Sequence, residues 1–320
     1  MKRLVSILMI VSAALAGCLA EGGGVDGEET EQESTTTYVD ILDFSKTDQG
    51  QWYDLIHNLN SQFDQVCGDT FCEGDYANIQ PLTFSCSVSS IRGNVKDCAW
   101  TFAAANVDVD QRNANIIIDA PTFQCHFQMK TTAVKLTSIL AGADALHAAL
   151  PGAPTATPSI YDQLSECFEH PIGQTQNALA QTGSLSYVSA RDYYTSSAGI
   201  DRWNAAKAAL KDGFDRVCGD TFCSGDFGDL QAMDFTCAIT KSTGNVKSCM
   251  WTFGGSWHLV AQGGGAQQIT ASTFKCPVMM KGTLSKFMDV LLAPGTDKAI
   301  NRPLPGMTTS AYEALLGCLP

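Results

Sequence analysis

A thirteen-residue segment occurs twice in this chain, and this duplication constrains the fold more than any other feature. Residues 63–75 read FDQVCGDTFCEGD and residues 214–226 read FDRVCGDTFCSGD, with 11 of 13 positions identical at a separation of 151 residues. The same separation relates tryptophans, cysteines and other aromatic residues outside the two segments. We therefore expect two homologous modules, each of about 130 residues and large enough to bury a core of its own.

Twelve of the thirteen cysteines belong to the duplication, six in each copy. They are Cys67, Cys72, Cys86, Cys98, Cys125 and Cys167 in the first copy and Cys218, Cys223, Cys237, Cys249, Cys276 and Cys318 in the second. In an exported chain an even, matched set indicates disulfide bonds, and we expect three within each copy. Six cysteines allow 15 connectivities, among which the sequence does not choose. Zinc is disfavoured because the copies share no histidine.

The remaining cysteine ends a segment typical of export signals. Met1-Lys2-Arg3 is a basic start, and residues 4–16 form an apolar stretch too short to span a bilayer. Leu15-Ala16-Gly17-Cys18 resembles the lipobox of bacterial lipoproteins. The resemblance implies that the signal peptide, residues 1–17, is removed and that Cys18 carries palmitate-type acyl chains. The alternative is an ordinary secretory signal that ends in a chance cysteine.

The sequence after Cys18 predicts how the two folded modules are attached to the membrane. Residues 18–37 are acidic, rich in glycine and poor in large apolar side chains, so we expect a flexible tether. Leu19, where an aspartate would indicate inner-membrane retention, favours the outer membrane and leaves open whether the body faces the periplasm or the cell surface. The formal net charge of −13 disfavours nucleic acid as a partner, so the membrane contact is expected through the lipid on Cys18.

Hydrophobic periodicity within one copy predicts an α+β module. A short strand precedes a long amphipathic helix that ends at Gly68, a position suited to a left-handed residue. Three strands with alternating apolar residues follow, then two shorter helices. We expect the long helix to pack on one face of a small antiparallel sheet. The expected segments are a strand at 38–44, a long helix that Thr47 or Asp48 can cap and that ends at Cys67, helices at 131–140, 159–168 and 197–218, and strands around 84–88, 98–102 and 123–125.

The expected boundaries and pairings follow from these segments. We define repeat 1 as residues 38–168 and repeat 2 as residues 187–320, with a polar linker at residues 169–186. A turn at residues 91–93 would place Cys86 beside Cys98, and a turn at Gln111-Arg112 would place Cys98 opposite Cys125.

Acidic residues in the repeated Asp-Gly loops are the candidate metal ligands. Carboxylate and amide oxygens spaced by glycines suit Ca²⁺, although the spacing is not that of an EF-hand and no bidentate glutamate completes it. Turn and cap hydrogen bonds are the favoured role for such residues in a loop closed by cysteines. The candidates are Asp69, Asp75, Asn78, Asp220, Asp226 and Asp229.

The chain carries no motif of a hydrolase nucleophile, a zinc protease, a phosphate-binding loop or a dinucleotide site. We therefore expect a non-enzymatic surface lipoprotein of the bacterial envelope, with a binding or structural role, a protein or glycan partner and no cofactor apart from the minority Ca²⁺ hypothesis. The alternatives are a Ca²⁺-dependent or carboxylate hydrolase acting on envelope material, and a peptidase inhibitor. Apart from the lipobox, the body resembles no characterised family.

Overall fold

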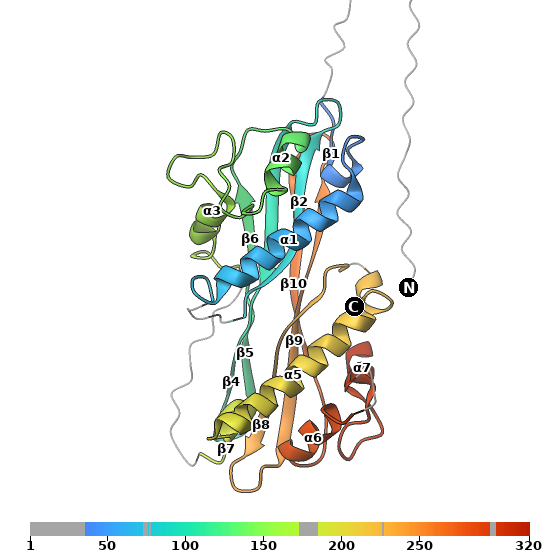
Figure 1. Ribbon diagram of the computed structural model, residues 1–320. Helices are drawn as coiled ribbons and strands as arrows, with labels where there is room; N and C mark the ends of the chain where they lie inside the picture. Colours follow the sequence, from blue (N-terminus) through green and yellow to red (C-terminus); the bar gives the residue numbers. More distant parts are fainter. Residues whose placement is uncertain (1–35, 73–75, 77, 173–184, 226, 295–298) are drawn as a thin grey trace, which may run out of the picture. The chain divides into compact units, whose positions relative to one another are not determined.

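Each repeat places a long helix across one face of an antiparallel sheet (Figure 1). The computed structural model describes residues 36–72, 76, 78–172, 185–225, 227–294 and 299–320. The signal peptide, Cys18, most of the tether and linker, Asp75 and Asp226 lie outside the described residues.

Repeat 1 contains β1 (Tyr38–Asp40), η1 (Ile41–Asp43), α1 (Gln49–Cys67), β2 (Gln80–Ser89), β3 (Val95–Ala103), β4 (Asn106–Val109), β5 (Ile116–Asp119), β6 (Thr122–Phe127), α2 (Ala133–Leu140) and α3 (Ile160–Cys167). Repeat 2 contains β7 (Tyr187–Ser189), α4 (Ala190–Tyr193), α5 (Ser197–Cys218), η2 (Phe222–Ser224), β8 (Gln231–Thr240), β9 (Val246–Val260), β10 (Gln267–Pro277), α6 (Leu284–Leu291), η3 (Ala299–Asn301) and α7 (Ala311–Leu316). The sheet orders are β1-β2-β3-β6 and β10-β9-β8-β7, with β4 and β5 as a separate ribbon. The α+β class expected from the sequence is confirmed.

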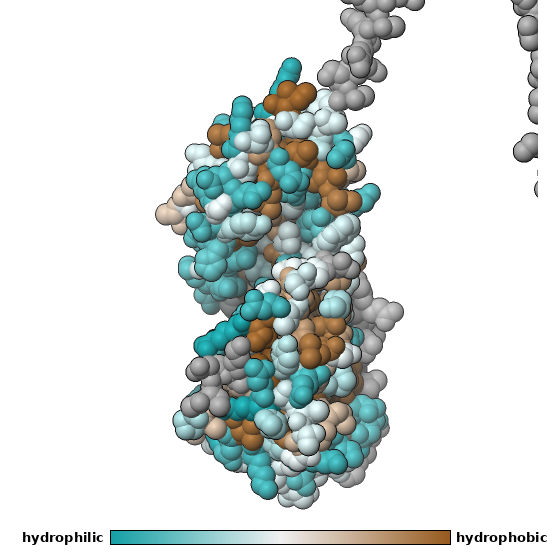
Figure 2. Space-filling view, turned by 90° about the vertical axis from the view of Figure 1, so that its right-hand side faces the viewer, coloured by the Kyte–Doolittle hydropathy of each residue, from teal (hydrophilic) through white to brown (hydrophobic). Residues whose placement is uncertain are grey.

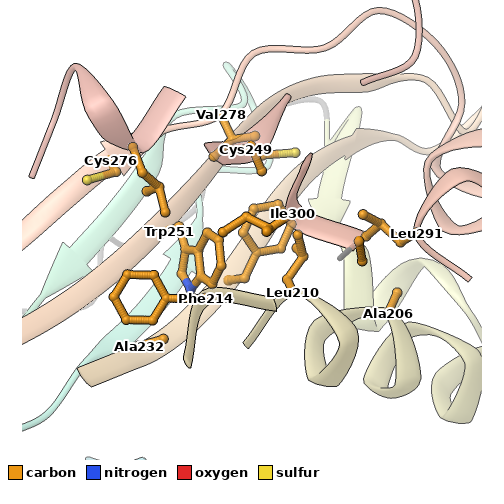
Figure 3. Close-up of a cluster of buried hydrophobic side chains, with 14 of the residues drawn as sticks. Ala206, Leu210, Phe214, Ala232, Cys249, Trp251, Cys276, Val278, Leu291 and Ile300 are labelled. Atoms are coloured by element: carbon orange, nitrogen blue, oxygen red, sulfur yellow. The ribbon is translucent and has the colours of Figure 1, made fainter. Parts of the chain in front are cut away.

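The long helices begin at side-chain caps and bury one face. Asp48 accepts a hydrogen bond from the Gln51 backbone N–H at 2.9 Å and begins α1. Trp52, Leu59 and Phe63 then recur at helical spacing on the buried face of α1. In repeat 2, Phe214 of α5 packs against Trp251 of the sheet in the same way (Figure 3).

The twelve body cysteines form six disulfide bonds, and every bond closes within one repeat. The bonds are Cys67–Cys72, Cys86–Cys98 and Cys125–Cys167 in repeat 1 and Cys218–Cys223, Cys237–Cys249 and Cys276–Cys318 in repeat 2. The expectation of three bonds in each repeat is confirmed. The first bond closes the turn after the long helix, the second joins β2 to β3, and the third joins β6 to α3.

Two local predictions were wrong, one because Asp40 caps a short helix and the other because a disulfide closes the turn after α1. The strand expected at 38–44 ends at Asp40, whose carboxylate accepts the Leu42 N–H at 2.8 Å and begins η1 instead. Gly68 follows α1 as expected, but it has right-handed dihedral angles, with φ −61° and ψ −29°. The Cys72 N–H donates to the Cys67 carbonyl at 2.7 Å, so the disulfide-closed turn follows the helix without a left-handed residue.

The pairing of β3 with β6 differs from the prediction by two residues. Cys86 lies opposite Cys98 as expected, but Cys98 lies opposite Phe127, and Cys125 faces Trp100. The hairpin uses a wider turn, closed by an Ala114 N–H bond to the Asp110 carbonyl at 2.9 Å. Ala114 has a φ of 64°, and Gly265 occupies the equivalent position of repeat 2 with a φ of 71°. A shift of two residues keeps every side chain on its predicted face.

The two repeats exchange hairpin tips, which we call arm 1 (residues 106–119) and arm 2 (residues 257–270). In arm 1 the Gln111 carbonyl accepts the Tyr187 N–H of repeat 2 at 3.0 Å. In arm 2 the equivalent Gln262 carbonyl accepts the Tyr38 N–H of repeat 1 at 3.1 Å. Figure 1 shows β4 and β5 running alongside repeat 2 while β9 and β10 run alongside repeat 1. Residues Thr36–Pro320 accordingly form one compact unit.

Candidate ligand-binding groove between the repeats

Arm 2 and the first strand and helix of repeat 1 enclose a groove of about 650 Å³. This is within the size range of small-molecule sites in proteins. Repeat 1 contributes Tyr38, Val39, Asp40, Leu42, Asp43, Tyr53, Thr83, Phe84 and Ser85, and repeat 2 contributes Gly225, Gly228, Asp229, residues 256–260 and Gln262. The groove therefore exists only because the two repeats pack together.

Asp229 organises the polar floor of the groove. Its carboxylate accepts hydrogen bonds from the Ser256 N–H at 2.6 Å, the Ser256 hydroxyl at 2.5 Å and the Thr83 hydroxyl at 2.6 Å. The buried Thr101 hydroxyl lies 2.7 Å from the Ser256 hydroxyl. These donors are all uncharged, and the bond from Thr83 joins Asp229 of repeat 2 to repeat 1. Ser256 and Thr101 are buried, so their hydroxyls are not placed as accessible nucleophiles.

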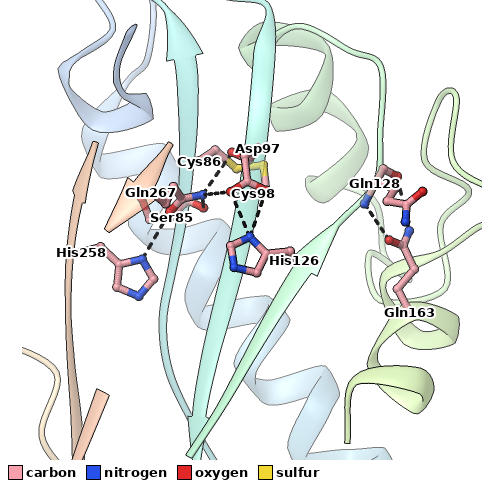
Figure 4. A network of polar contacts seen from close by, with 9 residues as sticks. All are labelled: Ser85, Cys86, Asp97, Cys98, His126, Gln128, Gln163, His258 and Gln267. Carbon is pink, nitrogen blue, oxygen red and sulfur yellow. Dashed lines mark hydrogen bonds and ion pairs between the residues drawn. A yellow bond between two sulfur atoms is a disulfide. The ribbon is translucent and has the colours of Figure 1, made fainter. Parts of the chain in front are cut away.

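A second series of polar contacts leads from the groove into the sheet of repeat 1 (Figure 4). His258 Nε2 lies 3.4 Å from Thr101 Oγ1, and His258 Nδ1 lies 3.4 Å from Gln267 Oε1. The Gln267 amide nitrogen donates to the Asp97 carbonyl at 3.2 Å. Asp97 in turn contacts His126 Nδ1 at 2.9 Å, and this bond raises the pKa of His126 above its ordinary value.

Burial, by contrast, lowers the pKa of His258 below its ordinary value, despite the opposing effects of the Gln267 hydrogen bond and the Asp229 and Asp40 carboxylates. His126 adds a smaller lowering effect. His258 is therefore neutral near pH 7 and adds no positive charge to the groove.

We expect His258 to make folding less favourable as the pH falls. A histidine whose folded-state pKa is lowered contributes stability above the unfolded value of about 6.5, and this stability is lost on acidification. His258→Val, which introduces the residue of the equivalent position Val107, should therefore lose less stability between pH 7 and pH 5 than the wild type. Urea unfolding at both pH values measures the difference. His57→Ala, at an exposed position of α1, is the control and should behave as the wild type; an equal loss in His258→Val contradicts the assignment.

The walls of the groove carry aromatic and aliphatic side chains that reach solvent. Tyr53 of α1 is 62% exposed, and Trp257 and Leu259 of β9 are 43% and 48% exposed. The other four tryptophans, Trp52, Trp100, Trp203 and Trp251, are buried in the two cores. Hydrophobic residues reach the surface as separate patches among hydrophilic ones (Figure 2). Side chains of this kind beside bonded carboxylates suit a ligand that is both apolar and polar.

Several polar and aromatic groove residues differ between the repeats, whereas other lining residues such as Phe84 and Gln262 match Phe235 and Gln111. Tyr53, Trp257 and His258 correspond to Asn204, Asn106 and Val107 at the separation of 151 residues. Asp229 and Ser256 likewise correspond to Asn78 and Ala105. The core tryptophans and the disulfides, by contrast, are matched. The backbone role is also matched, because Asn78 accepts the Ala105 N–H at 2.8 Å as Asp229 accepts the Ser256 N–H.

The structure describes four of the six candidate metal ligands, Asp69, Asn78, Asp220 and Asp229, and does not gather these four at one site, while Asp75 and Asp226 lie outside the described residues. Asn78 and Asp229 accept backbone N–H bonds from Ala105 and Ser256, each 27 residues away, so these bonds join distant segments and are not the local turn and cap bonds favoured by the sequence. Asp69 is exposed at the turn after α1. Asp220 lines a separate hollow of about 700 Å³ within repeat 2, together with Glu313, whose carboxylate caps α7 through Ser310. Among the described residues, no three His, Cys, Asp or Glu side chains are grouped to hold a metal ion.

Sequence reasoning identified Asp229 but not Tyr53, Trp257 or the other groove residues. The sequence does show that the two repeats differ at these positions. Only the structure shows that the differing residues lie together in one groove. No family model, curated protein or solved structure matches this chain. Within the described part of the chain, no helix is long and apolar enough to cross a membrane.

Proposed function

We propose that this chain is a lipid-anchored protein of the bacterial envelope that binds its ligand, without catalysis, in the groove between the repeats. The observation that carries this proposal is the specialisation of one groove. The core tryptophans and the disulfides are equivalent in the two repeats, whereas Tyr53, Trp257 and His258 are replaced by Asn204, Asn106 and Val107 at the equivalent positions. Exposed aromatic side chains add nothing to core packing, and their grouping in a hollow is typical of a recognition site.

Replacing the two aromatic walls tests the binding role. Tyr53→Asn with Trp257→Asn installs the residues of the equivalent positions Asn204 and Asn106, and both side chains are exposed, so folding should be preserved. The test uses the full mature chain with Cys18→Ala, which carries no lipid and therefore cannot sediment through a membrane anchor of its own. We expect it to co-sediment with one isolated envelope fraction, either sacculi, membranes or surface polysaccharide. The double variant should bind at least tenfold more weakly.

The matched control removes exposed apolar surface outside the groove. Ile91 and Val134 are 68% and 57% exposed, and Ile91→Asn with Val134→Asn should leave retention unchanged. Equal retention of wild type and groove variant, or a wild type that none of the fractions retains, refutes the binding proposal.

The lipid anchor is tested separately at Cys18. Three acyl chains contribute about 0.8 kcal/mol for each buried methylene group, so the mature protein should partition into detergent. Cys18→Ala should leave the precursor uncleaved or release the protein into the aqueous phase. Intact mass of the protein from its native host measures the modification, and an unmodified Cys18 in the mature chain is the result that excludes lipidation.

A further inference from the structure

We propose that the groove recognises an organic cation, an ammonium group carried on an apolar body, held between the Tyr53 and Trp257 side chains and the Asp40 and Asp229 carboxylates. This inference rests on the proposed binding function and specifies the chemistry of its ligand. Three properties of the groove support it: its charge, its aromatic walls and the restriction of both to one side of the duplicated fold.

The groove is negatively charged without a compensating cation. Asp40, Asp43 and Asp229 line it, and none of its described lining residues is a lysine or arginine. None of the ion pairs formed among the described residues involves these three acids. Asp40 accepts only neutral donors, the Leu42 N–H at 2.8 Å and the Ser85 hydroxyl at 2.5 Å. A cation entering the groove would therefore meet uncompensated charge in partly buried surroundings, where electrostatic attraction is stronger than in water.

The charge, like the aromatic walls, is specific to this groove. The β1 and β7 pairings make Asp40 equivalent to Ser189, and both side chains cap the short helix that follows. Serine thus fulfils the structural role without a charge. Asn78 similarly fulfils the backbone role of Asp229 without a charge. Two of the three acids therefore exceed what the fold requires, as shown by the other repeat.

The aromatic walls fit the same ligand. The electron-rich face of a tryptophan or tyrosine ring attracts a cation, and tryptophan does so most strongly. Leu259, also exposed in the groove, offers contact to an apolar body. An anionic ligand would face three carboxylates with no basic partner from the described lining residues, which disfavours it.

Collisional quenching of tryptophan fluorescence tests the charge directly. Trp257 is the exposed tryptophan, so the difference between wild type and Trp257→Phe reports on the groove. Relative to a free tryptophan amide, we expect quenching of Trp257 by Cs⁺ to be enhanced at least twofold and quenching by I⁻ to be reduced. Asp40→Ser with Asp229→Asn, the residues of the other repeat, should abolish this preference. If I⁻ quenches Trp257 of the wild type as strongly as Cs⁺ does, or more strongly, relative to the free tryptophan amide, the proposal is overturned.

Choline and its uncharged isostere 3,3-dimethylbutan-1-ol test recognition of the cation. Titration of the full mature Cys18→Ala chain, read from Trp257 fluorescence, should show at least tenfold tighter binding of choline. The Asp40→Ser/Asp229→Asn variant should lose most of this preference, because only Asp43 and the aromatic rings would still favour the cation, and equal binding of both compounds by the wild type overturns the proposal. Envelope co-sedimentation separates the two levels. If an envelope fraction retains the wild type and added choline does not reduce this retention, the cation proposal is refuted and the binding function stands. If no fraction retains the wild type, the binding function itself is refuted.

Discussion

Removal of the Cys125–Cys167 bond is expected to lower the free energy of unfolding by about 4 kcal/mol. The two cysteines are 42 residues apart, so the bond closes a long loop that joins β6 to α3. In the chain-entropy account, a cross-link restricts the unfolded chain more strongly as the loop becomes longer. Cys125→Ala with Cys167→Ala should accordingly shift the urea unfolding midpoint substantially, measured by tryptophan fluorescence at a fixed pH.

The chain provides both a comparison and a replicate for this experiment. Cys67 and Cys72 are only 5 residues apart, so loss of their bond should cost about 2 kcal/mol. Cys276–Cys318 has the same separation of 42 residues in repeat 2 and should reproduce the larger effect. A loss for the short loop equal to or larger than that for the long loops would contradict the loop-length argument.

Gly254→Ala is expected to destabilise the contact between the repeats by about 1–3 kcal/mol. A Cβ atom added at Gly254 of β9 would lie 2.3 Å from the Cβ of Ala103 in β3. Ala103 and Gly254 are equivalent positions, so the two central strands approach each other where the repeats meet. The clash involves short side chains fixed to backbone, which cannot rotate away. Thermal unfolding of the variant measures the loss.

The reciprocal substitution provides the control. Ala103→Gly with Gly254→Ala exchanges the two residues and restores one Cβ atom at the contact. In a double-mutant cycle, the stability loss of the double variant should be smaller than the sum of the two single losses by at least about 1 kcal/mol. Additive losses would show that the strands do not meet at these positions.

The sequence by itself determined most helices, the strands of each sheet and the residues that face each core, but not η1 or the strands β4 and β5. The spacing of Trp52, Leu59 and Phe63 places them on one helix face, and alternation places Phe84 and Trp100 on one sheet face. These patterns depend on local backbone geometry and are readable wherever one face is buried. The matched cysteines indicated bonds closed within each repeat, and α5 has the bounds expected from its periodicity, Ser197–Cys218.

The tertiary structure decided the hairpin register, the exchange of arms and the groove. The two-residue shift between β3 and β6 preserved the apolar face, so hydrophobic pattern could not detect it. The exchange of arms depends on backbone hydrogen bonds such as Tyr38 to Gln262, which any pair of residues can form. Tyr53 and Trp257 are far apart in the chain and line one groove only because β9 extends onto the other repeat. A duplicated sequence shows what the repeats share, whereas the packing of one repeat on the other shows which of their differences lie together.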